Sequence, residues 1–140
     1  MEKGRFEVAP PCVHDAIVIS LGSVGWKVLL DQDVDRWFLT LTHEDPRTAA
    51  LIQDAIDILA REGPSLGRPL VDRIRNSQHH NMKELRPGSA GSSEIRILFA
   101  FDPQRRAILL VAGDKAGDWS DWYKSNVPIA DARLNRHLGK

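Results

Sequence analysis

Hydrophobic and polar residues alternate along three closely spaced runs, at residues 79–86, 94–102 and 107–115. A period of two is typical of β-strands, and both connections favour turns: residues 87–93 are small and flexible, and residues 103–106 are short enough for a hairpin. The runs therefore predict an antiparallel meander of three strands. On the middle strand one face is large and apolar, so we expect helices to cover it; its members are Ile95, Ile97, Phe99 and Phe101.

A strand and two helices are predicted upstream of the meander. Residues 26–30 are rich in strand formers. Apolar residues then recur at positions 34, 37, 38 and 41, which predicts an amphipathic helix near residues 33–42. Asp45 and Pro46 suit a helix start and Gly63-Pro64 a helix end, so a second helix is predicted at 46–62. The short connection favours an antiparallel pair of helices.

This order of elements predicts an α+β fold. The first strand joins the meander in one mixed, mainly antiparallel, four-stranded sheet, and the helical hairpin packs on that sheet. Short C-terminal helices follow, one around residues 119–124 and one that begins at Pro128. Residues 26–140 form the domain. Residues 1–25 are expected to be a loosely attached N-terminal extension, although residues 16–21 could form a short strand.

Polar residues gather on the opposite face of the predicted meander. If Leu85 points into the core, then Glu84 and Arg86 share a face with Arg96. An acid surrounded by arginines on one sheet face suggests a binding or catalytic surface. The same residues would also suit a solvated face with ordinary cross-strand ion pairs, so the pattern alone leaves both interpretations open.

Charge is unevenly distributed, although the formal net charge is zero. Residues 1–62 hold 6 Lys and Arg against 11 Asp and Glu, whereas residues 63–106 hold 8 against 4. The meander is thus the basic part of the chain, which indicates an anionic ligand there. The single cysteine, Cys12, excludes an internal disulfide and fits the cytoplasm. We expect no signal peptide and no membrane span.

Asp31, Asp33 and Asp35 have a spacing that could suggest a cation site. Carboxylates before and within a first helical turn also cap the helix and complement its dipole, and no histidine or further acid cluster supports a metal. Helix capping is the favoured interpretation, and no metal site is predicted.

The motifs, taken in order, resemble the HigB-like, phage-related branch of the RelE/ParE toxin superfamily. The resemblance covers about residues 26–138 and leaves out residues 1–25. It is carried by the strand at 26–30 with its two helices, by Glu84-Leu85-Arg86, by the strand at 94–99 with Arg96, and by Gly113-Asp114-Lys115 followed by residues 119–124. Each motif is weak alone, and their order and spacing make the resemblance fairly specific.

The resemblance implies the toxin of a type II toxin–antitoxin system. RelE-like and HigB-like members cleave messenger RNA on the ribosome, whereas ParE-like members share the fold and inhibit DNA gyrase without catalysis. The expected partners are a HigA-like helix-turn-helix antitoxin, the ribosome and messenger RNA. A metal-independent, cofactor-free endoribonuclease is the first hypothesis and a gyrase inhibitor the second. A phage-derived protein that has lost toxicity is a third.

By this resemblance, the candidate catalytic residues are Arg96 first, then Arg86, with Lys115, Tyr123, Glu84 and His80. Arginine forks suit phosphate oxygens, and an aromatic residue can stack on a base. Glu84 could carry a proton or only hold an arginine, and His80 could instead form a surface pair with His79. Further RNA contacts are predicted at Arg73, Arg75, Lys83, Trp122 and Lys124. Tryptophans such as Trp119 and Trp122 are more often core residues than ligand platforms, and a core position is the alternative interpretation for both. RelE-like members carry lysines where this chain has Met82 and Glu84, so the acid–base assignment stays open.

Overall fold

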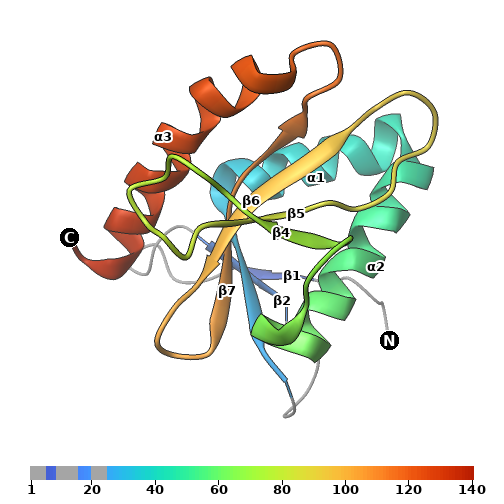
Figure 1. The fold of residues 1–140 in the computed structure, drawn as a ribbon. Coiled ribbons are helices and arrows are strands. Elements are labelled where there is room, and N and C mark those ends of the chain that lie inside the picture. Colours follow the sequence, from blue (N-terminus) through green and yellow to red (C-terminus); the bar gives the residue numbers. More distant parts are fainter. Residues whose placement is uncertain (1–5, 9–15, 20–24) are drawn as a thin grey trace.

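A mixed sheet of seven strands runs through the molecule, with helices on both faces (Figure 1). The computed structural model describes residues 6–8, 16–19 and 25–140, and the side chains from residue 25 onward. The strand order is β1-β2-β3-β7-β6-β5-β4, and β3 and β7 are the only parallel pair among the described strands. The strands are β1 (Phe6–Val8), β2 (Ala16–Ile19), β3 (Lys27–Asp31), β4 (Val71–Arg73), β5 (Lys83–Leu85), β6 (Ile95–Phe101) and β7 (Arg106–Asp114).

The predicted sheet of four strands was too small. β4 pairs with β5 at one edge, and β1 and β2 extend the other edge beyond β3. β4 has only three residues, too few to show a period of two within the proline- and arginine-bearing connection at 64–78. In the predicted N-terminal extension, β2 pairs with β3 in antiparallel register. Cys12 lies outside the described residues.

The predicted helical hairpin is confirmed as α1 (Gln32–Glu44) and α2 (Pro46–Glu62). Asp31 caps α1 by accepting a hydrogen bond from the backbone N–H of Asp33 at 3.0 Å, and Asp45 caps α2 through the N–H of Thr48. Gly63 caps the C-terminus of α2, and its φ of 64° puts it in the left-handed region. A Cβ there would lie 2.2 Å from Nε1 of Trp26, so both backbone and packing require glycine. A 3-10 turn, η1 (Gly63–Ser65), follows.

The hairpin buries the apolar face of β6, as predicted. Ile95, Ile97 and Phe99 are almost fully buried in one cluster with residues of α1 and α2, and Phe101 packs at its edge. Burial of aromatic and branched side chains on this face supplies the main driving force for the hairpin to dock.

A single helix, α3 (Trp119–Leu138), covers the other face of the sheet (Figure 1). The predicted break at Pro128 is wrong, because Pro128 lies inside α3 on its exposed side, where the Lys124 carbonyl that loses its helical donor can meet water. α3 buries Trp122, Val127, Ala130 and Leu134 against a second apolar cluster that includes Met82 and Leu98. The polar face of the meander is therefore covered over much of its area rather than open.

A β-bulge helps to fix α3. Leu98 of β6 pairs with Val111 and Phe99 pairs with Leu109, so Leu110 has no partner on β6. The carbonyl of Leu110 accepts a hydrogen bond from Arg133 of α3 at 2.7 Å. Arg133 and Arg136 also form ion pairs with Asp31. Asp31 therefore both caps α1 and holds α3. The C-terminal turn of α3 is held by His137, 2.9 Å from Asp102.

Candidate functional site: a buried carboxylate beneath a basic cavity

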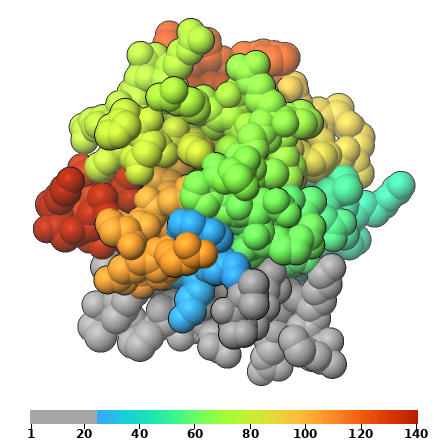
Figure 2. Space-filling model, turned by 60° about the horizontal axis from the view of Figure 1, so that its bottom comes forward, coloured from blue at the N-terminus to red at the C-terminus, as the bar shows by residue number. Residues whose placement is uncertain are grey.

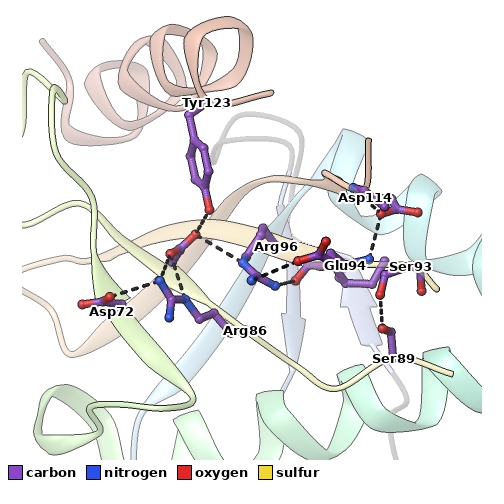
Figure 3. Close-up of polar contacts among 11 residues, drawn as sticks. Asp72, Arg86, Ser89, Ser93, Glu94, Arg96, Asp114 and Tyr123 are labelled. Carbon is purple, nitrogen blue, oxygen red and sulfur yellow. Dashed lines mark hydrogen bonds and ion pairs between the residues drawn. The ribbon is translucent and has the colours of Figure 1, made fainter. Parts of the chain in front are cut away.

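Glu84 is the centre of a polar network between β5, β6 and α3. Its carboxylate is buried, with Oε1 accepting a hydrogen bond from the hydroxyl of Tyr123 at 2.6 Å. Oε2 accepts two from Arg86, from Nε at 2.9 Å and from Nη2 at 2.8 Å. Nε of Arg96 lies 3.7 Å from Oε1. In Figure 3, Tyr123 reaches from α3 toward the sheet, and Arg86 and Arg96 approach the same point. Two cations thus surround one carboxylate.

Strand alternation explains why these side chains meet. Leu85 lies in the core under the helical hairpin, which turns Glu84 to the α3 face. The prediction that Glu84, Arg86 and Arg96 share a face is confirmed by their contacts. α3 stands over that face and places Tyr123, in its second turn, above the carboxylate.

Tyr123 is held in its neutral form. Burial, and then the hydrogen bond to Glu84, raise the pKa of the phenol to about 12. Ionisation would put a phenolate against a carboxylate in a partly dehydrated site. Tyr123 therefore acts as a hydrogen-bond donor over the whole neutral pH range.

Lys115 lies at the end of β7 beside this network. It is buried, and its ammonium stands 4.6 Å from the centre of the Trp119 ring and 5.4 Å from that of Tyr123. Burial, and then the positive charge of Arg96, lower the pKa of Lys115 from its usual value. A lysine in this state gives up a proton more readily than one on the surface.

A cavity of about 670 Å³ opens above the network, between α3 and the β4–β5 connection. Its wall carries five cationic side chains, from Arg73, Arg75, Arg86, Lys115 and Lys124, against two acidic ones, Asp72 and Glu84. Tyr123 also lines it. The predicted residues Arg73, Arg75, Glu84, Arg86, Lys115, Tyr123 and Lys124 are therefore brought together. Such a cavity favours an anionic ligand.

Arg96, ranked first from the sequence, stands behind the cavity wall. Its side chain is only 15% exposed, and it is absent from the residues that line the cavity. Nη1 donates to the carbonyl of Ile95 at 2.8 Å. These contacts suit a residue that holds Glu84 and acts on Lys115 through its charge.

Three predicted residues lie elsewhere. Lys83 is on the hairpin face, with its ammonium 5.6 Å from the Phe101 ring. His80 is exposed beside a neighbouring hollow and does not line this cavity. Trp122 is buried over Gly113, where a Cβ would lie 2.9 Å from its Nε1. For Trp122 the structure supports the alternative interpretation, a core residue.

Two residues of the site were missed from the sequence. Asp72 accepts a hydrogen bond from Nη2 of Arg86 at 3.1 Å, so the guanidinium lies between two carboxylates. Nothing in a three-residue strand marks that acid as special. Trp119, interpreted as a core residue, is 59% exposed beside Lys115. Its place as the first residue of a helix could have suggested exposure.

Neither a metal cluster nor a membrane helix is found in the described part of the chain. No three His, Cys, Asp or Glu side chains among residues 25–140 come together in a group that could hold a metal ion. None of the described helices has the length and apolar character to cross a bilayer.

Comparison with known proteins identifies the family. Residues 37–135 match the family described as phage derived protein Gp49-like. The chain is 58% identical over 111 residues to "Putative toxin HigB3" of Mycobacterium tuberculosis, covering 79% of this chain and 92% of that protein.

A second relative from the same organism, "Putative toxin HigB2", is 51% identical over 130 residues, or 93% of this chain. The chain spans only 63% of the length of HigB2. No solved structure matches the chain significantly. The matches to the Gp49-like model and to two named toxins agree with the order of motifs, and the chain belongs to the HigB-like toxins of the phage-derived Gp49-like family.

Proposed function

We propose that this protein is the toxin of a type II toxin–antitoxin system and that it cleaves messenger RNA on the ribosome. One observation carries the proposal: a cavity with five cations on its wall lies directly above a carboxylate that orients both a phenol and an arginine. The cations suit a phosphodiester, and no metal is needed for their part in the reaction.

In this mechanism the RNA supplies its own nucleophile. The 2′-oxygen attacks the adjacent phosphorus, the bond from phosphorus to the 5′-oxygen breaks, and the products are a 2′,3′-cyclic phosphate and a 5′-hydroxyl. The proton of the 2′-hydroxyl passes to water. Lys115 gives its proton to the departing 5′-oxygen, since its pKa is lowered and the residue lines the cavity.

Arg86 binds the phosphate as charge builds up on it. Its Nε and Nη2 are held by Glu84 and Asp72, which fixes the orientation of a guanidinium in a residue that lines the cavity. Glu84 acts as a positioning residue and not as a base, because both of its oxygens already accept hydrogen bonds. Tyr123, which is neutral at physiological pH, holds the Glu84 carboxylate in a fixed position relative to α3 through its hydrogen bond.

Purified protein added to translating ribosomes tests this function. We expect new messenger RNA ends that carry a cyclic phosphate upstream and a 5′-hydroxyl downstream of each cut. The control is a folded Lys115→Ala variant, which should give no such ends. Intact messenger RNA combined with inhibited supercoiling by DNA gyrase would replace this proposal with the gyrase hypothesis.

A HigA-like helix-turn-helix antitoxin is the proposed partner, since an unchecked toxin of this kind would stop growth. Co-expression with the product of an adjacent gene should restore growth and allow the two proteins to be purified as a complex. Growth arrest that persists with every adjacent reading frame would count against this partner.

A further inference from the structure

A second hollow of about 560 Å³ lies against the same segment as the cavity above Glu84. The two share the lining residues Asp72, Arg73, Ile74, Arg75 and Asn76. The second hollow adds Arg68, Ser77 and His80. We call this second hollow the basic groove; its polar lining is Arg68, Asp72, Arg73, Arg75, Asn76, Ser77 and His80.

The charges of the basic groove are largely uncommitted. Arg73 and Arg75 are exposed, and neither guanidinium makes an ion pair or hydrogen bond with another residue in the described part of the chain. Arg68 pairs with Asp72 at 3.3 Å, and Asp72 is also shared with Arg86. The groove thus holds three arginines and one carboxylate, and that carboxylate is already shared between Arg68 and Arg86.

The loop that forms the basic groove is fixed in place by α3. Asp131 of α3 is buried and accepts hydrogen bonds from the hydroxyl of Ser77 and from the N–H of Gln78 at 3.0 Å. Nε2 of His79 lies 2.7 Å from Oδ1 of Asn135. Figure 2 shows residues 75–80 beside the C-terminal end of α3.

Burial of the Asp131 carboxylate lowers the stability of the fold unless its hydrogen bonds offset the lost hydration. A connection with no further role would not need such a contact. The arrangement is reasonable if the loop must present its arginines in a fixed geometry. A groove fixed before binding loses less entropy when a ligand binds.

We propose that the basic groove binds the sugar–phosphate backbone of nucleotides next to the cleaved bond in single-stranded RNA. The inference rests on the proposed function, which makes RNA the substrate. The lining offers guanidinium, amide, hydroxyl and imidazole donors. The exposed large hydrophobic residues among those described, Leu39, Leu51, Trp119 and Ile129, do not line the groove, so its chemistry favours phosphates over an apolar protein partner. His80, a catalytic candidate from the sequence, becomes a backbone contact.

RNA length separates the basic groove from the catalytic cavity. We would measure the affinity of a dinucleotide and of a six-nucleotide RNA by fluorescence anisotropy over a range of salt concentrations. A 2′-deoxy sugar at the cleavage position prevents turnover. The wild-type protein should bind the longer RNA more tightly and with a steeper salt dependence. Each phosphate contact to a single strand contributes about 0.7 to the slope of log K against log salt.

The double variant Arg73→Ala/Arg75→Ala should lower that slope by about 1.4 on the longer RNA. The dinucleotide has a single phosphate and should lose less of its slope, although both arginines also line the catalytic cavity. The control is Lys27→Ala/Arg61→Ala, which also removes two exposed cations, neither of which lines the groove. This control should keep the wild-type slope for both RNAs.

A double variant that keeps the wild-type slope, or a wild-type protein that binds both lengths equally, would overturn the basic groove as a subsite. Failure of the proposed function looks different. In that case the longer RNA binds with the expected slope, while messenger RNA on translating ribosomes stays intact.

Discussion

The hydroxyl of Tyr123 donates a hydrogen bond to Oε1 of Glu84 at 2.6 Å, across 39 positions of the chain. This contact joins α3 to β5 at the floor of the basic cavity. It orients the carboxylate that in turn holds Arg86, so the position of a helix on the sheet sets the position of a guanidinium.

The ionisation of Tyr123 can be followed directly, because it is the only tyrosine in the chain. We expect its absorbance near 295 nm to titrate with a midpoint of about 12 in the folded protein, and of about 10 in denaturant. Since the folded-state pKa is the higher one, the neutral phenol stabilises the fold below about pH 10, and this stabilisation is lost as the pH rises through about 12.

Glu84→Gln separates the two causes that raise the pKa of Tyr123, burial and the contact with the Glu84 carboxylate. Burial remains and the negative charge is lost, so the midpoint should fall toward 10 without reaching it. A folded wild-type protein whose tyrosine titrates at the denatured value would show that the contact with Glu84 does not form in solution.

The helical hairpin should depend on Phe99, which is fully buried at the centre of its cluster. Phe99→Ala leaves a cavity and is expected to lower the free energy of unfolding by about 3–5 kcal/mol, as measured by chemical denaturation. Leu39→Ala, on the exposed side of α1, is the control and should change it by no more than about 0.5 kcal/mol. A loss below about 1 kcal/mol for Phe99→Ala would mean that the hairpin does not pack on this face.

Gly113 lets α3 approach the sheet. Because a Cβ at this position would lie 2.9 Å from Nε1 of buried Trp122, Gly113→Ala should push α3 outward and cost about 1–3 kcal/mol. Tyr123 is the next residue, so its titration midpoint should also fall as the bond to Glu84 lengthens. Gly67→Ala meets no atom within 4 Å and should leave both measurements close to those of the wild type. If Gly113→Ala keeps the wild-type stability and Tyr123 titration, a methyl group fits between Gly113 and Trp122 and α3 does not need glycine at this position.

The sequence predicted the elements whose signal is local. Helices α1 and α2 are marked by apolar periodicity and by caps at Asp31 and Asp45, and the two faces of β6 follow from simple alternation. Alternation also placed Glu84, Arg86 and Arg96 together. The resemblance to HigB-like toxins added Lys115 and Tyr123, which alternation alone could not place.

The errors around α3 concern contacts between distant parts of the chain. Pro128 was interpreted as a helix start because proline suits the first turn of a helix and usually breaks a helix interior. Packing of Trp122 and Leu134 on both sides of it keeps α3 continuous. The docking of α3 depends on pairs such as Arg133 with Asp33, which are 100 residues apart. Without that docking the polar face of the meander looks open, and Arg96 looks like the most accessible arginine.

Lys115 should titrate below the usual value for a lysine. Burial is the first cause and the charge of Arg96 the second, so Arg96→Gln should raise the pKa of Lys115 relative to the wild type. NMR of lysine labelled with ¹³C at Cε would follow the side chain directly, with Lys115→Met to assign its signal. In the cleavage assay, the rate should fall at alkaline pH as the ammonium loses its proton. A Lys115 signal that titrates at the ordinary lysine pKa in both proteins would remove the proposed proton donor.

The two arginines around Glu84 should differ in their effect on cleavage. Arg86 lines the cavity and is held by Glu84 and Asp72, whereas Arg96 lies behind the wall and donates to the carbonyl of Ile95. Arg86→Lys keeps the charge but loses the fork that spans the two carboxylates. We expect it to lower ribosome-dependent cleavage by about 10²–10³, the usual effect of removing one preorganised donor.

Arg96→Lys should lower the cleavage rate less than Arg86→Lys does, because Arg96 affects the bound phosphate only indirectly, through Glu84 and Lys115. Circular dichroism and the Tyr123 titration would show that both variants keep the fold. The order of the two effects decides between the assignments. If Arg96→Lys is the more damaging, Arg96 reaches the phosphate, as the sequence alone had indicated. If both folded variants cleave messenger RNA at the wild-type rate, neither arginine stabilises the reacting phosphate and the catalytic assignment of this cavity fails.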